Sequence, residues 1–283
     1  MSTVLFEAPG PRTRARHRLY SIFGFVLVGG LALFVLWKMY AEGQFEYDLW
    51  EPFVTPAYVE AILLQGLWQT LQMAFLSIIF AVIFGLIFGI AKISDRPYVR
   101  WPAWLVVEFF RAVPLLLLMV FIFFSYGVGD GFGSYWSVVI ALTLYNGSVL
   151  AEVFRAGLNA VPSGQGEAAY AVGMTKSQVI WIVQLPQAVK IMLPAIISQM
   201  VVALKDTSLG YYILAPGLTA IGKQVYTQFS NQFQTVIVIA LLYIIANLIL
   251  TFVATWVQKR FVGEKTISVP MVGEASADAG RGV

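Results

Sequence analysis

The sequence has no cysteine, and its one histidine, His17, lies in an arginine-rich segment near the N-terminus. Without cysteine there is no disulfide framework and no thiolate chemistry. A single histidine also excludes a metal site or a proton relay built from several imidazoles. Glycine-rich phosphate loops of the P-loop kind are missing as well, so a membrane enzyme is disfavoured and we expect any ATP to be hydrolysed by another chain.

Charged residues are scarce too: they make up 12% of the 283 residues, whereas 59% are hydrophobic and the mean hydropathy is +0.78. This composition is too apolar for a soluble domain and predicts an all-α polytopic membrane protein. The net charge of +3 is small, and no nucleic-acid partner is expected. Six apolar runs are long enough to span a bilayer: residues 20–40, 66–91, 103–126, 135–158, 189–214 and 235–257.

The charges between these runs set the topology. The segment after the first run is external by the positive-inside rule, because Lys38 is the only cation near it. It carries the acidic residues Glu42, Glu46, Asp48, Glu51 and Glu60. Other connections are basic and therefore cytoplasmic, through Lys92, Arg96, Arg100, Lys176, Lys190, Lys259, Arg260 and Lys265. Both termini are then cytoplasmic, with residues 1–19 as a basic tail and residues 264–283 as a disordered tail. A cleaved signal peptide is the alternative for the N-terminus, but the first run is long enough to span.

Three local patterns concern helix packing. Gly85 and Gly89 have the G-x-x-x-G spacing of a close helix–helix contact, although glycine is also common in membrane helices, and both interpretations stay open. Glu108 and Arg111 are three residues apart and can form a structural ion pair on one helix face. Pro114 is expected to bend its helix or to free a carbonyl within it.

Residues 159–188 form the longest polar connection, NAVPSGQGEAAYAVGMTKSQVIWIVQLPQA. A break at residues 162–164 predicts a helix that begins near Glu167, with an arc of small residues on one side: Ala168, Ala169, Val172 and Gly173. Glycine inside a helix costs about 1 kcal/mol, so either a close contact or a helix end must favour Gly173. Leu185 and Pro186 are expected to stop regular structure before the next span.

The order Glu167-Ala168-Ala169, Gly173, Val183, Leu185 and Pro186 resembles the EAA signature of bacterial ABC importer permeases, E-A-A-x3-G-x9-I-x-L-P. Val183 stands where that pattern has isoleucine. The resemblance implies a cytoplasmic coupling helix that docks into a groove on an ATP-hydrolysing subunit. The alternative is a short amphipathic loop helix whose spacing is incidental.

Further motifs are similar to those of polar amino acid permeases. They are EFFRAVPLL at 108–116, LAEVFRA at 150–156 (with Ala156 where glycine is usual), LKDTSL at 204–209 and GLWQTLQMA at 66–74. The resemblance covers residues 66–263. It implies the type I transmembrane domain of an ABC importer, with a five-helix core and one additional N-terminal helix at 20–40.

By this resemblance the chain is a pore-forming subunit in a bacterial cell membrane. Its implied partners are a dimer of ATP-binding subunits, a second similar or identical permease, and an extracellular or periplasmic solute-binding protein. ATP and Mg would be bound by the ATPase, and this chain would bind no cofactor or metal. The chain is most similar to permeases for glutamate or aspartate, of the corynebacterial glutamate type, but permeases for basic amino acids, glutamine and cystine share the motifs. An ion-gradient-driven secondary transporter is the alternative, although no internal repeat supports it.

Polar residues within the spans are candidates for the substrate path, because ionisable groups in a bilayer are costly and usually face a cavity or a partner. An amino acid needs partners for both its ammonium group and its carboxylate. Glu152 is a candidate for the ammonium group, and Lys205 or Arg111 for the carboxylate. Neutral hydrogen bonds are assigned to Gln69, Thr70 and Asn146. Asp206 belongs to the same set, although Lys205 and Asp206 are also explained by a neutralised pair that holds helices together.

Overall fold

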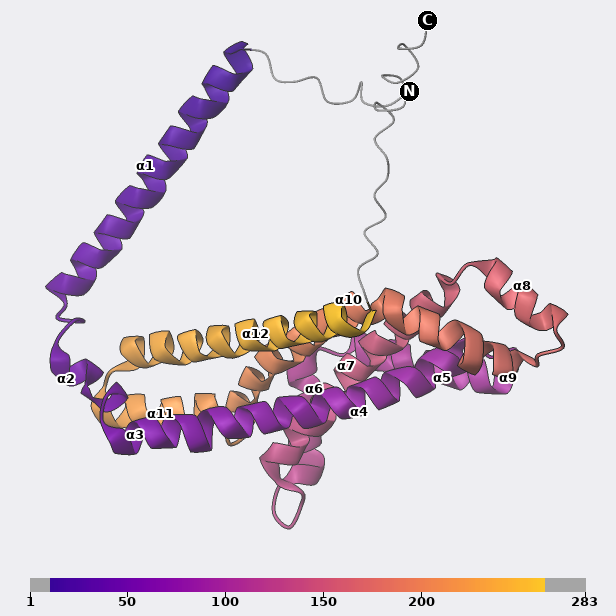
Figure 1. Ribbon diagram of the computed structural model, residues 1–283. Coiled ribbons are helices and arrows are strands. Elements are labelled where there is room, and N and C mark those ends of the chain that lie inside the picture. Colours follow the sequence, from indigo (N-terminus) through magenta and orange to yellow (C-terminus); the bar gives the residue numbers. More distant parts are fainter. Residues whose placement is uncertain (1–10, 263–283) are drawn as a thin grey trace, which may run out of the picture.

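The computed structural model describes residues 11–262, and within that range the chain is built of helices joined by short turns. The first helix, α1 (Pro11–Ala41), stands apart from the bundle (Figure 1), and the apolar window within it is 0% buried. Helix α1 begins at Pro11, so residues 11–19 of the predicted basic tail are helical. Proline is well tolerated in the first turn of a helix. The other tail residues, 1–10, and the predicted tail at 264–283 lie outside the described residues.

The second span starts earlier than the sequence predicts. After the external pieces α2 (Tyr47–Trp50) and η1 (Glu51–Phe53), one continuous helical stretch contains α3 (Pro56–Glu60), the π-helical η2 (Ala61–Leu67) and α4 (Trp68–Lys92). Hence the span extends about three turns to the N-terminal side of Gly66.

The third span is two helices with a sharp bend. The axes of α5 (Pro97–Ala112) and of the segment formed by α6 (Leu115–Ile122) and η3 (Phe123–Gly127) are bent by 101°. Val113 is extended at the break, with φ −77° and ψ 128°, because the ring of Pro114 disfavours helical conformation in the residue before it. The predicted bend at Pro114 is confirmed, and it turns α5 across the direction of α6.

Helix α7 (Gly133–Asn159) packs closely along α4. A Cβ atom added to Gly85 would lie 2.7 Å from the Cβ of Leu150, and one added to Gly89 would lie 2.8 Å from the carbonyl oxygen of Ala151. No side chain fits at either position without moving the helices apart. The close-packing interpretation of Gly85 and Gly89 is therefore confirmed.

The polar connection leads into a long helical stretch that crosses the bundle. The connection itself contains α8 (Ser163–Ala171). The long stretch that follows is made of α9 (Lys176–Gln178), the π-helical η4 (Val179–Gln184) and α10 (Leu185–Asp206). The predicted stop at Leu185 and Pro186 is wrong, because the helix continues through both residues. Pro186 directly follows the π-helical η4, and a local π-helical turn can accommodate the missing N–H of a proline. The fifth span consequently runs over Lys176–Ile213.

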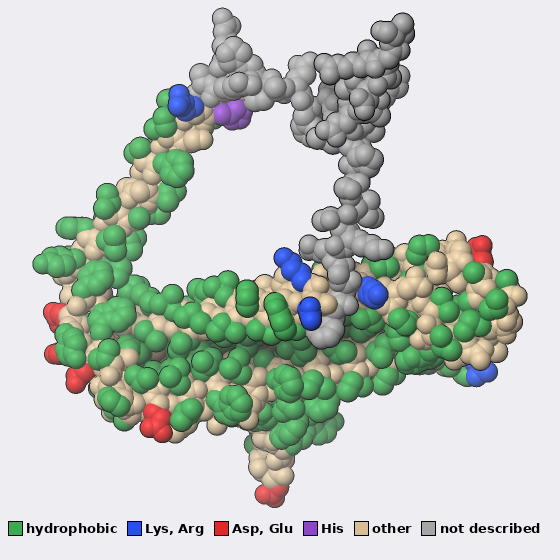
Figure 2. Space-filling model, in the orientation of Figure 1, with side chains coloured by type: hydrophobic (Ala, Val, Ile, Leu, Met, Phe, Trp, Pro, Cys, Tyr) green, Lys and Arg blue, Asp and Glu red, His purple; other side chains and the backbone are tan. Residues whose placement is uncertain are grey.

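The chain returns through a short outer helix and a last span. The 3-10 helix η5 (Thr207–Ile213) leads to α11 (Leu218–Phe229), whose apolar face packs on Ile62 of η2, and α12 (Gln232–Val262) follows. In the described range five helices are long and apolar enough to span a membrane, and the bent pair gives a sixth. In Figure 2 acidic side chains gather at the end of the molecule that carries α2 and α3. The sign of the charges thus agrees with the predicted topology.

Candidate functional site

Helix α8, in the polar connection, begins at Ser163 and not near Glu167 as predicted. Pro162 precedes it in an extended conformation, so Glu167 lies in the second turn. The helix ends at Ala171, and Gly173 has φ +85°, which glycine adopts at little cost. A Cβ added to Gly173 would meet no atom within 4 Å. Of the two predicted explanations for Gly173, the helix end is therefore the correct one.

The predicted arc of small residues is divided between two environments. Ala169 is buried, with 6% of its surface exposed, on the side where α8 packs against η4. Gly166 lies on the same side, and a Cβ added there would be 3.3 Å from the Nε2 of Gln184. Val172, in contrast, is 79% exposed, and Glu167 and Ala168 are exposed with it. Of the predicted docking residues, Glu167, Ala168 and Val172 are therefore accessible to a partner on the helix surface, whereas Ala169 is not.

The end of this connection is fixed to the neighbouring cytoplasmic loop. Thr175 and Gln178 form a capping box at the start of α9, in which the Thr175 N–H donates to Gln178 Oε1 at 2.8 Å. Lys176 forms an ion pair with Asp95, in the turn between α4 and α5. This ion pair links the start of α9 directly to the loop that leads into the bent third span.

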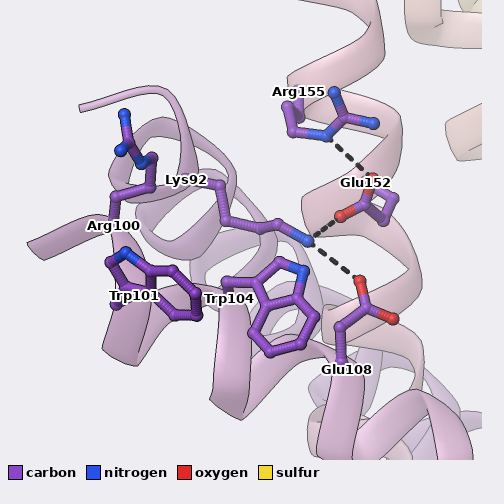
Figure 3. Close-up of a pocket in the computed structure, with 7 residues that line it drawn as sticks. All are labelled: Lys92, Arg100, Trp101, Trp104, Glu108, Glu152 and Arg155. Atoms are coloured by element: carbon purple, nitrogen blue, oxygen red, sulfur yellow. Dashed lines mark hydrogen bonds and ion pairs between the residues drawn. The ribbon is translucent and has the colours of Figure 1, made fainter. Parts of the chain in front are cut away.

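An ion network joins three helices at the cytoplasmic end of the bundle. The Nζ of Lys92, at the end of α4, donates to Glu152 of α7 and, at 3.1 Å, to Glu108 of α5. Figure 3 shows the lysine side chain extending between the two carboxylates. Only 6% of the Lys92 side chain is exposed, so its charge is compensated by these carboxylates rather than by water.

Two arginines complete the network. Arg155 donates to Glu152 at 2.9 Å, and Arg111 donates to Glu108 at 3.2 Å. The predicted pair of Glu108 and Arg111 is confirmed. Sequence reasoning assigned Lys92 only to the inner loop and missed its role in the network. The position of Lys92 at the end of an apolar helix suggests that its charge needs a partner, but nothing in the sequence indicates which carboxylates provide it.

Each oxygen of the two carboxylates in this network accepts at least one hydrogen bond. Glu152 uses Oε1 for Lys92 and Oε2 for Arg155, while Glu108 uses Oε1 for Lys92 and both oxygens for Arg111. A substrate ammonium group that approached Glu152 would meet a carboxylate whose charge is already compensated by two cations. Likewise Arg111, predicted to face a carboxylate, already has a carboxylate partner in its own chain.

A second polar contact lies within the membrane-spanning part. Asn146 of α7 is 1% exposed, and its Nδ2 donates to the carbonyl of Leu142 at 3.0 Å. The Nε2 of Gln199, on α10, donates to the Oδ1 of Asn146. Gln199 is only partly buried, so the pair reaches an accessible surface. Gln199 is not among the residues predicted for the substrate path, although a glutamine within an apolar run is a recognisable signal.

Thr70 has a hydrogen-bonding role inside the chain. It is 1% exposed, donates to the carbonyl of Gly66 at 3.0 Å and accepts from the backbone N–H of Leu218 at 2.8 Å. It therefore fixes the start of α11 to α4, and its hydroxyl is already used for that purpose. Gln69, its neighbour, is half-buried.

Lys205 and Asp206 end helix α10, and no ion pair joins them among residues 11–262. The predicted neutralised pair is therefore wrong, because adjacent helical residues point about 100° apart. Lys205 is exposed and lines an apolar groove beside α12, whereas Asp206 is half-buried.

The predicted substrate-path residues do not converge on one site in the single chain. Arg111 and Glu152 belong to the cytoplasmic ion network, Asn146 pairs with Gln199, and Thr70 bonds to Leu218. Within the described range no hydrogen bond or ion pair links these three groups with one another. The described residues also contain no group of three or more His, Asp or Glu able to hold a metal ion.

Comparison with known proteins gives consistent matches. The model of the family described as "Binding-protein-dependent transport system inner membrane component" matches residues 81–263. The glutamate transport system permease protein GluD of Corynebacterium glutamicum is 40% identical over 223 residues, which cover 77% of this chain and 82% of that protein. The arginine transport system permease protein ArtQ of Bacillus subtilis is 31% identical over 204 residues, covering 70% of this chain and 91% of that protein. A crystal structure of an amino acid ABC transporter with histidines superposes with a TM-score of 0.66 at 28% identity, covering 74% of this chain and 98% of that one.

Proposed function

The chain belongs to the family of binding-protein-dependent transport system inner membrane components, and we propose that it is the membrane-spanning subunit of an ABC importer for glutamate or aspartate. It is a multi-pass protein of the cell membrane. The observation that carries the choice of substrate is the 40% identity, over 77% of the chain, with a permease named for glutamate transport. A relative named for arginine transport is more distant, at 31% identity.

In this proposal ATP and Mg are bound by a separate dimer of ATP-binding subunits, and the exposed side of α8 docks on them. Two links support transmission from that surface into the bundle. Helix α8 packs on η4, which continues directly into α10, and Lys176 pairs with Asp95 beside the bent third span. The nucleotide state of the ATPase then biases the bundle between two arrangements through these contacts.

A second permease, identical or similar, completes the pore, and a solute-binding protein delivers the amino acid from outside. Within this pore the substrate path is proposed to include Asn146, Gln199 and Lys205. Asn146 and Gln199 support this assignment because they form a polar pair within the spans, and Lys205 because it ends α10 as an exposed cation. Glu152 and Arg111 are proposed instead to hold the cytoplasmic ends of the helices together.

Uptake of radiolabelled glutamate tests the substrate proposal. Cells that express the chain with its neighbouring genes are expected to accumulate glutamate, with competition by excess aspartate and little by arginine, glutamine or cystine. Loss of arginine or glutamine uptake on deletion of the gene, with glutamate uptake intact, would show that the substrate is wrong while the role as a permease remains. Uptake that persists without ATP and stops when ion gradients collapse would instead support a secondary transporter.

The docking surface is tested by single cysteines, since the chain has none of its own. Val172→Cys places a thiol on the exposed end of α8, and Lys259→Cys is the control on the exposed cytoplasmic end of α12. An associated ATPase subunit is expected to shield the first thiol from a membrane-impermeant maleimide and to leave the second reactive. Equal labelling of both, in a preparation that contains the ATPase, would contradict docking at α8.

A further inference from the structure

The cytoplasmic ion network forms one wall of a pocket with a volume of about 460 Å³. Lys92, Glu108, Glu152 and Arg155 line this wall, and the start of α5 supplies the rest through Arg100, Trp101 and Trp104. In Figure 3 the two indoles lie beside the stem of Lys92. The pocket is separate from the α8 surface and from the pair of Asn146 and Gln199.

The residues that line the pocket carry more positive than negative charge, and several of their donors have no partner. The carboxylates of Glu108 and Glu152 are already paired with Lys92, Arg111 and Arg155. Among the described residues Arg100 makes no ion pair, Arg155 uses only its Nε, and the indole N–H groups of Trp101 and Trp104 have no acceptor. A ligand for this pocket must therefore supply acceptors and negative charge. The ammonium group of a zwitterionic amino acid would meet only carboxylates that are already paired with cations.

The surroundings of the pocket are those of a membrane–water interface. The pocket lies between the cytoplasmic ends of α4 and α7 and the start of α5. The axis of α5 is bent by 101° from that of the segment formed by α6 and η3. The side chains of Tyr98, Trp101 and Trp104 are 69%, 64% and 46% exposed. Exposed Trp and Tyr beside arginine are typical of segments that lie at the level of the lipid headgroups.

We propose that this pocket binds the phosphodiester headgroup of an anionic phospholipid from the cytoplasmic leaflet. The guanidinium groups of Arg100 and Arg155 bind the phosphate oxygens, and the indole N–H groups donate to the remaining acceptors. The apolar faces of Trp101 and Trp104 contact the glycerol backbone and the first methylene groups of the acyl chains. The lipid fills the space between α5 and the ends of α4 and α7, and so stabilises the bent third span.

The test uses quenching of tryptophan fluorescence by brominated lipids. The full-length chain is reconstituted into phosphatidylcholine vesicles that contain increasing fractions of brominated phosphatidylglycerol or, separately, brominated phosphatidylcholine. The proposal predicts stronger quenching by phosphatidylglycerol at equal fraction. In Arg100→Gln this preference falls about tenfold, as expected for the loss of a hydrogen bond between charged groups.

Arg96→Gln is the matched control, because Arg96 lies one turn from Arg100 and does not line the pocket. An equal loss of preference in both variants would show general attraction of anionic lipid to the loop and would overturn the proposal. The double variant Trp101→Phe/Trp104→Phe removes the two fluorophores of the pocket and so shows whether the excess quenching by phosphatidylglycerol arises there. If the excess quenching by phosphatidylglycerol survives in it, the lipid binds elsewhere and the proposal is wrong.

Two competitors separate the sources of an anion. Inorganic phosphate at millimolar concentration is expected to leave the excess quenching unchanged, because it offers no apolar part to the indoles. Competition by phosphate would identify a free-anion site, and competition by glutamate would identify an amino acid site, and either result overturns the lipid assignment. The measurement requires no transport, so its outcome is independent of the proposed function.

Discussion

The side-chain amide of Gln199 donates a hydrogen bond to the Oδ1 of Asn146 and so joins α10 to α7 within the membrane. The two residues are 53 positions apart in the sequence. Asn146 is buried while Gln199 is partly accessible, so a substrate that reaches this depth meets Gln199 first. We therefore expect this pair to influence substrate binding more than stability.

Gln199→Leu is expected to raise the KM of glutamate uptake about tenfold, which corresponds to the loss of one hydrogen bond. The maximal rate should change little, because the coupling surface is untouched. Gln228→Leu is the control, since Gln228 also loses one hydrogen bond between elements, to Tyr58 on the outer side. Equal KM values in both variants would remove Gln199 from the substrate path.

Lys92→Gln is expected to lower the free energy of unfolding by about 3 kcal/mol, because it leaves two carboxylates without their shared cation. The exposed pair of Lys38 and Glu42 supplies the control: Lys38→Gln should lower the free energy of unfolding by less than about 0.5 kcal/mol. Thermal unfolding in detergent measures both. Adding Glu152→Gln to the Lys92→Gln chain should restore part of the loss. A double variant less stable than Lys92→Gln alone would contradict the network.

Glu152→Gln by itself distinguishes a structural carboxylate from a substrate ligand. Since both oxygens of Glu152 are bonded to Lys92 and Arg155, we expect the apparent affinity for glutamate to stay within about twofold of the parent. The unfolding temperature should fall. A large rise in KM at unchanged unfolding temperature would place Glu152 in contact with the substrate.

Gly89→Ala is expected to destabilise the bundle by about 1 to 3 kcal/mol, because the new Cβ would lie 2.8 Å from the backbone oxygen of Ala151 and force α4 away from α7. The control is Gly30→Ala in α1, where an added Cβ meets no atom within 4 Å. The unfolding temperatures of the two variants give the comparison. A Gly89→Ala chain as stable as Gly30→Ala would show that the helices are not in close contact.

Gly173→Ala and Gly164→Ala form a pair within the polar connection. Gly173 has φ +85°, a backbone conformation that is strained for alanine. Gly173→Ala is therefore expected to destabilise this conformation by about 1 kcal/mol and to disturb the end of α8. Gly164 lies inside α8 with open space around it, and alanine should strengthen the helix. The amount of ATPase subunit that co-purifies is expected to fall for Gly173→Ala alone. An equal yield for both variants would mean that the end of α8 does not contribute to docking.

The sequence by itself determined the membrane class, the number and order of the spans, their orientation and the position of the polar connection. These features depend on local composition: run length decides whether a segment spans, and the sign of the flanking charges decides its direction. The bend at Pro114 and the pair of Glu108 with Arg111 were predictable for the same reason, because their causes lie within four residues.

Only the tertiary structure decided which faces of the helices meet. It brought Lys92 to Glu152, Gln199 to Asn146 and Thr70 to Leu218, across separations of 60, 53 and 148 residues. In a bilayer the lipid-facing and the packed sides of a helix are both apolar, so periodicity carries little information about the partner of each face. Close packing of backbones and the pairing of costly polar groups settle those contacts, and both depend on the whole bundle.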